Sequence, residues 1–177
     1  MKALIVVDML NDFVTGSLKC DRAQRIIPHI KALIEGFRKK KLPVIFANDS
    51  HFHTDFEMDR WGAHAIEGTE GAQVIPELDP KKDDTIVEKH VYSSFFETPL
   101  DSVLRSRKVD TVVLTGLHTH LCVRHTAADA FFRGYKILVP ENGVDSFTAE
   151  DHESGLAYLK EYYAAQITDA AAILKEL

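Results

Sequence analysis

The fold is decided by one stretch, residues 111–134, which reads TVVLTGLHTHLCVRHTAADAFFRG. It opens with the apolar run of a buried strand, passes through a tight loop at 116–121 and continues as a helix. We expect the helix to end at Gly134, because glycine readily adopts the left-handed conformation just past a helix end. A strand that runs through a short loop into a helix is the repeating unit of parallel α/β sheets, so this stretch predicts that class of fold.

Cys122 lies where the loop of this stretch becomes the helix. The unpaired N–H groups and the positive end of a helix favour a thiolate over a thiol, and the thiolate is the nucleophilic form of cysteine. Most free cysteines are instead small buried hydrophobic residues. The stretch alone therefore leaves two interpretations of Cys122, a nucleophile and a core residue.

Composition places the chain among ordinary globular proteins. It has 177 residues, 45% of them hydrophobic and 27% charged, which is enough for one domain over residues 1–177. A formal net charge of −6 argues against nucleic acid and membranes as partners, and no run approaches the length of a membrane span. The short apolar run that Asp8 ends does not resemble a signal peptide, and two cysteines without a disulfide framework indicate a cytoplasmic location.

Strands and helices alternate on both sides of the opening stretch. Apolar runs predict strands at 3–7, 44–47, 85–88, 111–115, 135–139 and 165–167. Helices are predicted at 26–40, 122–133 and 169–174. Two more are predicted from capping patterns: one starts at Thr98-Pro99, with Asp101 completing a capping box, and one runs from Thr148 to about 162. The expected fold is a three-layer α/β/α sandwich with a mainly parallel, Rossmann-like central sheet.

Polar residues follow the carboxyl ends of several predicted strands. Asp8, Asp49 and Lys89 each stand at the end of an apolar run, and the loop before Cys122 follows a fourth. Ligands of parallel sheets bind outside the carboxyl ends of the strands, so we expect these four pieces of chain to meet at one site.

Three of these residues make a chemically coherent set. Asp8 can accept the proton of Cys122 and later deliver it to a leaving amine, while Lys89 holds the thiolate. We also expect the Lys89 charge to lower the pKa of Asp8. Taken singly, Asp8 is an ordinary helix-capping acid and Lys89 a solvated lysine; only their combination predicts catalysis.

The loop before the helix offers further groups. Gly116 allows a sharp turn, after which the N–H of Cys122 and one from the Leu117–His118 region can form an oxyanion hole. A Cys–His pair is the runner-up catalytic arrangement. Its candidate bases are His118, His120 and His125, which otherwise are wall or surface residues.

A long polar loop after the strand at 44–47 carries candidate metal ligands. In an extended segment Asp49 and His51 point to the same side, and His64 can fold back to join them. Two imidazoles and a carboxylate, with positions left open, suit a catalytic zinc, iron or manganese ion. The alternatives are three solvated side chains, or His53 as a competing ligand.

Together these motifs resemble the isochorismatase-like cysteine hydrolase superfamily, and within it the nicotinamidase and N-carbamoylsarcosine amidase relatives. The resemblance covers nearly the whole chain and is carried by ALIVVDMLNDF at 3–13, by Lys89 with YSSFFETPL at 92–100, and by GLHTHLCV at 116–123. It implies that Asp8, Lys89 and Cys122 are the family triad. It also implies a cis peptide at Leu117–His118 and oxyanion donors at the N–H groups of His118 and Cys122.

The resemblance bears on the metal as well. Asp49, His51 and His64, with His64 three residues after Trp61, match the metal motif of nicotinamidases, which implies a divalent ion, zinc first. His118 stands where nicotinamidases usually have a small residue. Segment 12–20 lacks their stretch rich in glycine and proline, and segment 61–69 also differs from theirs. Proper isochorismatases lack the nucleophilic cysteine, so the resemblance argues against vinyl-ether hydrolysis.

The implied activity is cysteine-dependent hydrolysis of a small amide, nicotinamide first, through a thioester. An amidase for N-carbamoyl or ureido compounds, with a vestigial metal site, is the second hypothesis, and a catalytically idle binding scaffold is the third. The substrate-binding residues we expect are Phe13, Trp61 and Leu117, with Phe13 and Trp61 as flat walls for a planar substrate. We expect a small-molecule amide as partner, and a homo-oligomer.

Overall fold

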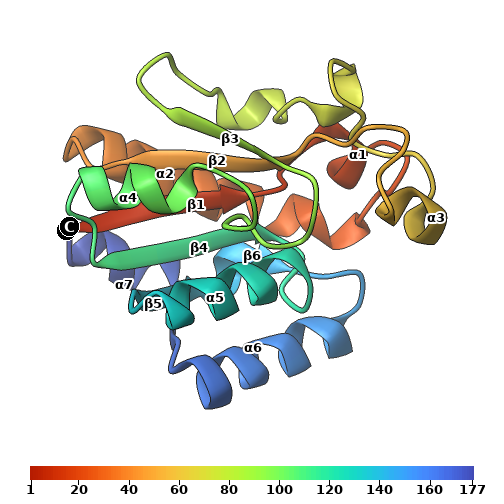
Figure 1. The fold of residues 1–177 in the computed structure, drawn as a ribbon. Coiled ribbons are helices and arrows are strands. Elements are labelled where there is room, and N and C mark those ends of the chain that lie inside the picture. Colours follow the sequence, from red (N-terminus) through yellow and green to blue (C-terminus); the bar gives the residue numbers. More distant parts are fainter.

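A parallel sheet forms the centre of the molecule in the computed structural model, which describes all of residues 1–177. Its seven strands follow the order β3 (Thr85–Lys89), β2 (Val44–Asp49), β1 (Lys2–Val7), β4 (Thr111–Leu117), β5 (Lys136–Pro140) and β7 (Gln166–Thr168), while β6 (Val144–Asp145) pairs with β4 (Figure 1). Every pair of neighbouring strands is parallel. The predicted three-layer α/β/α fold is confirmed.

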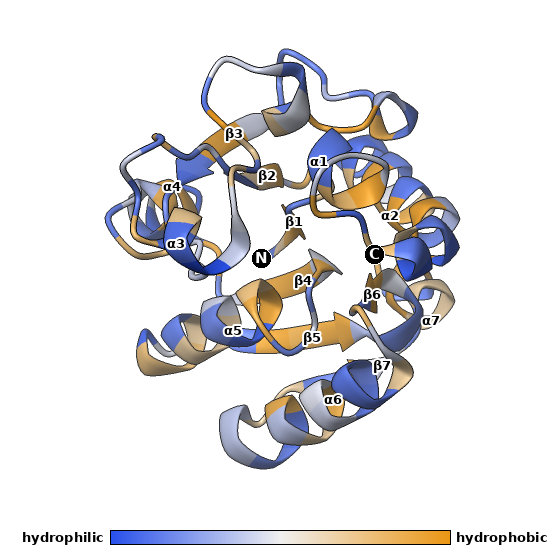
Figure 2. Ribbon diagram, turned by 90° about the vertical axis from the view of Figure 1, so that its right-hand side faces the viewer, coloured by the Kyte–Doolittle hydropathy of each residue, from blue (hydrophilic) through white to orange (hydrophobic).

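Helices cover both faces of the sheet. The α2 helix (Ile27–Lys39) and α7 (Ala170–Lys175) pack on one face, and α4 (Leu100–Ser106) and α5 (Cys122–Phe132) on the other, with α6 (Ala149–Tyr163) against α5 (Figures 1 and 2). Two short helices, α1 (Asn11–Val14) and α3 (Glu57–Trp61), lie in the loops after β1 and β2. None of the helices has both the length and the apolar character that a membrane crossing demands.

The buried strands explain why their sequences do not alternate. Along β1, Leu4 and Val6 pack towards α2, whereas Ile5 and Val7 pack towards α5, and all four side chains are fully buried. A strand covered on both faces needs apolar residues at every position. Figure 2 shows the consequence: apolar strands at the centre, with the polar sides of the helices outside.

Several predicted helix ends have the expected chemistry. The Thr148 side chain caps α6 by accepting a hydrogen bond from the N–H of Asp151 at 3.0 Å. Asp169 caps α7 in the same way through the N–H of Ala172, at 2.7 Å. Gly134 has φ +78°, the left-handed conformation predicted after α5.

The start of α4 differs from the prediction. Pro99, rather than Thr98, occupies the N-cap position, and the Thr98 hydroxyl accepts only a long hydrogen bond from Leu100 N–H, at 3.3 Å. Asp101 does not complete a capping box, because its carboxylate accepts a hydrogen bond from the Tyr135 hydroxyl at 2.7 Å. The Asp101 carboxylate thus makes a tertiary hydrogen bond to Tyr135 instead of the local capping contact that the sequence pattern predicts.

The carboxyl ends of the central strands meet at one edge of the sheet. Strand register pairs Asp49 with Lys89 across β2 and β3, and Val7 with Gly116 across β1 and β4. Gly116 has φ +98°, and a Cβ at that position would lie 1.9 Å from the carbonyl oxygen of Val7. Only glycine permits this close approach, which brings the residue after Val7, Asp8, beside the loop that leads to Cys122.

Candidate active site

Lys89 is the charged centre of this edge. Its Nζ lies 2.8 Å from Oδ2 of Asp8 and forms a second ion pair with Oδ1 of Asp49. The other carboxylate oxygen of Asp8 accepts a hydrogen bond from the backbone N–H of Asp49 at 2.8 Å. All three side chains are almost fully buried. Buried charges of this kind are stable only when they are paired, and here each charge has a partner.

Burial and neighbouring charges set the protonation states. Burial acts to lower the pKa of Lys89, but the Asp49 and Asp8 carboxylates outweigh it and hold this pKa well above the usual value. The pKa of Asp8 is raised to about 6, by burial first and by the Asp49 carboxylate next, against the opposing effect of Lys89. Lys89 thus acts in the expected direction, but the expectation of a lowered pKa for Asp8 was wrong, because burial and Asp49 outweigh Lys89. Asp8 is nevertheless mostly ionised at neutral pH.

Cys122 is the first residue of α5 and is 5% exposed. Its Sγ lies within 4.8 Å of a carboxylate oxygen of Asp8 and one of Asp49. Burial raises the pKa of the Cys122 thiol well above its usual value, although Lys89 pulls it down. The helix end was expected to favour a thiolate, whereas burial and the Asp8 and Asp49 carboxylates favour a neutral thiol, beside a carboxylate that can take its proton.

The loop between β4 and α5 presents two backbone donors beside Cys122. The peptide bond between Leu117 and His118 is cis. The carbonyl of His118 accepts hydrogen bonds from the N–H groups of Leu121 and Val123, at 2.9 and 3.2 Å. The N–H groups of His118 and Cys122 donate to no backbone carbonyl. These are the two donors that the sequence resemblance assigned to an oxyanion hole.

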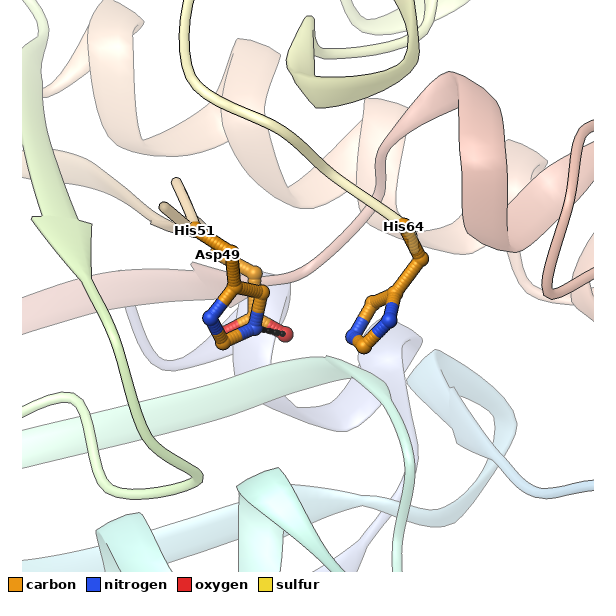
Figure 3. Close-up of side chains that lie close together, drawn as sticks. All are labelled: Asp49, His51 and His64. Atoms are coloured by element: carbon orange, nitrogen blue, oxygen red, sulfur yellow. Dashed lines mark ion pairs between the residues drawn. The ribbon is translucent and has the colours of Figure 1, made fainter. Parts of the chain in front are cut away.

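The three predicted metal ligands also lie together. Figure 3 shows the rings of His51 and His64 and the carboxylate of Asp49 grouped around one space, and one ligand atom of each lies within 4.8 Å of the others. Nδ1 of His51 is 2.9 Å from a carboxylate oxygen of Asp55, and Nδ1 of His64 is 2.8 Å from the carbonyl oxygen of Gly62. These outward contacts leave Nε2 of both rings for a ligand. Burial acts to lower the pKa of His51, but the Asp49 and Asp55 carboxylates outweigh it and raise this pKa to about 9, so a metal would replace the proton on Nε2.

The donor set of this cluster fits a divalent metal. Nε2 of His51 is buried, has no hydrogen-bond partner, and lies 3.5 Å from Oδ2 of Asp49. Burial acts to raise the pKa of Asp49, but Lys89 and His51 outweigh it and lower this pKa to about 2, so the carboxylate is charged. Two imidazoles oriented by outward hydrogen bonds, plus a carboxylate, are a typical zinc ligand set. An ion would give the orphaned nitrogen its partner.

The remaining histidines of the prediction lie elsewhere. His53 is exposed and is not part of the metal cluster. Nδ1 of His120 is 3.0 Å from the Ser146 hydroxyl, and Nδ1 of the exposed His125 is 2.9 Å from the carbonyl oxygen of Leu121. His118, in contrast, is buried beside Cys122 and has a hydrogen-bond partner on neither ring nitrogen.

A small pocket joins the two clusters. Its lining residues are Phe13, Leu18, Asp49, Glu57, Trp61, His64, Tyr92, His118, Leu121, Cys122 and Phe147. The predicted walls Phe13 and Trp61 are among them, whereas Leu117 packs in the core on the α2 side and does not line the pocket. The pocket volume is about 20 Å³, roughly the space of one water molecule, so a substrate must displace its walls. A larger groove, of about 610 Å³, lies at the opposite end of the sheet and contains none of these residues.

The sequence analysis did not predict five of the lining residues as site residues: Leu18, Glu57, Tyr92, Leu121 and Phe147. Trp61 Nε1 donates a hydrogen bond to the Tyr92 hydroxyl at 2.9 Å, and the Trp61 ring stacks near Phe147, with centroids 6.1 Å apart. The pKa of Glu57 is raised to about 7, by burial and then by the Asp49 carboxylate. Tyr92 could have been predicted as a site residue, because it stands in the YSSFFETPL motif. No sequence pattern indicates Phe147, because it follows a strand of only two residues.

Comparison with known proteins shows which family the chain resembles in sequence and fold. Residues 2–172 match the Isochorismatase domain. The crystal structure of N-carbamoylsarcosine amidase from Thermoplasma acidophilum is similar, with 41% identity, a TM-score of 0.90 and 96% of each chain covered. Nicotinamidase from Bacillus subtilis has 37% identity and a TM-score of 0.90, over 95% of this chain and 99% of that one.

A third solved structure bears on the metal cluster. Pyrazinamidase of Pyrococcus horikoshii, whose crystal structure is a complex with zinc, has 30% identity and a TM-score of 0.89, over 95% of this chain and 98% of that one. The match of the domain across nearly the whole sequence and these similarities agree with one another. The chain therefore belongs to the isochorismatase family and is a hydrolase.

Proposed function

We propose that this hydrolase cleaves the carbon–nitrogen bond of a small linear amide through a thioester on Cys122, with nicotinamide as the first candidate substrate. The observation that carries the proposal is the buried cluster in which Lys89 holds Asp8, and Asp8 lies within 4.8 Å of the Cys122 thiol, beside a pocket. A base, a nucleophile and a fixed positive charge are the groups that acyl transfer to a thiol requires.

The first half of the reaction uses these groups in turn. Asp8 takes the thiol proton as Sγ of Cys122 attacks the carbonyl carbon. The oxygen, which becomes negative, accepts hydrogen bonds from the N–H groups of His118 and Cys122. The charge of Lys89 stabilises the thiolate while it forms. Because the resting thiol is neutral, proton transfer and attack occur together once the substrate is bound.

The second half reverses the proton's path. Protonated Asp8 gives its proton to the departing ammonia, and the acyl group stays on Sγ as a thioester. Asp8 then removes a proton from a water molecule, which attacks the thioester, releases the acid and restores the thiol. A pKa of about 6 suits Asp8 to both steps, since a group that titrates near neutral pH can both accept and donate a proton.

We assign the second cluster to a divalent metal, with zinc first and iron or manganese as alternatives. Asp49, His51 and His64 would hold it, and when bound it supplies a coordination position for a polar atom of the substrate. The orphaned Nε2 of His51 supports the assignment, as does the zinc named for the similar pyrazinamidase.

An N-carbamoyl or ureido compound is the second candidate substrate. Two observations favour it: the similarity to N-carbamoylsarcosine amidase, and a polar side chain, His118, in the pocket next to Cys122. The cytoplasmic location and the homo-oligomer stay predictions.

Ammonia release tests the proposal across a panel of nicotinamide, pyrazinamide, N-carbamoylglycine, N-carbamoylsarcosine and short aliphatic amides. The enzyme is assayed after loading with zinc, with the Cys122→Ala variant as the blank. We expect the highest kcat/KM for nicotinamide; a higher value for an N-carbamoyl compound selects the second candidate. Absence of ammonia from every member would contradict the amidase proposal and favour an idle scaffold.

A further inference from the structure

His118 is the least satisfied polar side chain around the pocket. It is 3% exposed, and neither Nδ1 nor Nε2 has a hydrogen-bond partner. The two other histidines of the same stretch do have partners: Ser146 for His120 and the Leu121 carbonyl for His125. Buried polar groups are nearly always hydrogen-bonded, because leaving one unpaired costs free energy. An exception inside a reaction pocket therefore needs an explanation.

The ring of His118 is held by aromatic neighbours rather than by polar ones. It stacks on Phe147, with centroids 4.0 Å apart and planes at 24°, and Phe13 approaches edge-on at 5.9 Å. Phe13 and Phe147 line the same pocket as His118 and Cys122. The imidazole is thus fixed in orientation while its two nitrogens stay without hydrogen-bond partners, which is how a recognition group is preorganised.

The charge state of His118 limits the kinds of substrate atom that its side chain can bind. Burial lowers its pKa to about 3, with the neighbouring His120 acting in the same direction. The ring is therefore neutral, with one N–H donor and one acceptor nitrogen. A neutral ring between two phenylalanines offers no cation for a carboxylate. It is suited to an uncharged polar atom, either an N–H or a heteroaromatic nitrogen.

We propose that the neutral imidazole of His118 is a specificity-determining group that hydrogen-bonds an uncharged polar atom in the acyl part of the substrate. The inference rests on the proposed amidase function and deepens it. The substrate class is small amides that carry a ureido N–H or a ring nitrogen close to the reacting carbonyl, in preference to amides with a purely hydrocarbon acyl group. The backbone N–H of His118 faces the reacting oxygen, and its side chain selects the acyl group.

Two matched pairs of substrates test this assignment. Propylurea and pentanamide differ by N–H against CH₂ beside the carbonyl, and nicotinamide and benzamide differ by N against CH in the ring. The measured quantity is the ratio of kcat/KM within each pair, because comparing that ratio between enzymes cancels the intrinsic reactivity of the substrates. The pair whose ratio changes tells which polar atom His118 contacts.

The variants are His118→Phe, His118→Gln and, as the control, His125→Phe. Phenylalanine keeps the stack on Phe147 and removes both nitrogens, so we expect the ratio to fall about 10- to 100-fold in at least one pair. Glutamine supplies a donor and an acceptor and should restore part of it. His125 is exposed and already bonded, so its variant should keep the wild-type ratios. Unchanged ratios in both pairs with His118→Phe would overturn the inference.

A second measurement separates this inference from the amidase proposal. In the Cys122→Ser protein, which cannot form the thioester, binding of propylurea and nicotinamide is measured by titration calorimetry, with and without His118→Phe. Binding that weakens about 10-fold with the phenylalanine variant supports the role of His118 even if no wild-type turnover is found. Turnover combined with binding that does not depend on His118 would retain the amidase and reject this role.

Thermal unfolding supplies an independent check on the fold of the variants. If both nitrogens of His118 are unpaired without substrate, His118→Phe removes a desolvation cost, so its Tm should equal or exceed that of the wild type. A markedly lower Tm would show that the imidazole has a structural partner, and it would overturn the inference.

Discussion

The two halves of the site differ in how complete they are. The proposed nucleophile centre (Asp8, Lys89 and Cys122) holds its charges in close ion pairs, since the Lys89 ammonium contacts the buried carboxylates of Asp8 and Asp49. The proposed metal centre (Asp49, His51 and His64) keeps a buried nitrogen, Nε2 of His51, without a hydrogen-bond partner. We therefore expect folding alone to assemble the first half, whereas an ion would complete the second.

Asp49 belongs to both halves. One of its carboxylate oxygens pairs with Lys89, and the other faces Nε2 of His51 at 3.5 Å. A carboxylate shared in this way fixes the distance between the nucleophile and the metal. Changes in the proposed nucleophile centre should therefore stop the chemistry or unfold the protein, whereas changes in the proposed metal centre should mainly affect substrate binding.

The largest expected effect is on catalysis. Cys122→Ala should lower kcat/KM for the best amide by about 10⁴-fold or more, because no other group can carry the acyl intermediate. Cys20→Ala is the matched control: Cys20 is also buried, but its Sγ donates only to the carbonyl oxygen of Ser146, at 3.3 Å. Ammonia release measures both. Comparable losses in the two variants would remove the distinction between the cysteines.

The next effect is on stability. Lys89→Met leaves the buried carboxylates of Asp8 and Asp49 without their cation, which should cost about 3–5 kcal/mol in the free energy of unfolding. Lys81→Met is the control, since the Lys81–Asp79 pair is exposed and its loss should be far smaller. Urea denaturation measures both. Equal stability of the two variants would show that the Lys89 cluster is not the buried network described here.

The zinc content of variants should show that the metal is held by the proposed metal centre. We expect about one zinc ion per chain, lost in His51→Ala and kept in His53→Ala, because the exposed His53 lies outside the cluster. Loss of the ion should raise KM for nicotinamide about 10- to 100-fold and change kcat less. Elemental analysis and steady-state kinetics decide it. If the wild type contains no transition metal and takes none up, the metal centre must be abandoned.

The smallest expected effect is a pH dependence. Asp8 must be ionised to accept the thiol proton, and its pKa is raised to about 6, so kcat/KM should fall as pH decreases through about 6, with the slope of one proton. At pH 7 and above, the ionisation of Asp8 should no longer limit kcat/KM. A kcat/KM profile of the zinc-loaded enzyme checks the sign, and constant activity down to pH 4.5 would exclude Asp8 as the base.

The sequence was sufficient wherever burial alone decides the structure. The unbroken apolar run before Asp8 predicted a strand covered on both faces, and the parallel strands predicted that Asp8, Asp49 and Lys89 meet at one edge. The candidate metal ligands lie together in the structure, which could be predicted because a carboxylate and an imidazole two residues apart share a face of an extended segment.

Features that depend on neighbours distant in sequence could not be predicted from the sequence. The pKa of Asp8 rises because burial and Asp49 outweigh Lys89, which requires the register of three strands. Phe147 follows β6, a strand too short to show a pattern. Leu117 stands in the catalytic stretch, yet its side chain points into the core, since residues of β4 alternate between the two faces of the sheet.

The central claim, a thioester on Cys122, is tested most directly by partitioning with hydroxylamine. Nicotinamide and methyl nicotinate share an acyl group and differ in their leaving group, so a common acyl-enzyme must divide between hydroxylamine and water in the same proportion. A common thioester predicts that, at each hydroxylamine concentration, the ratio of hydroxamate to nicotinate is the same for both substrates. Different ratios for the two, or nicotinate without any hydroxamate, would contradict it.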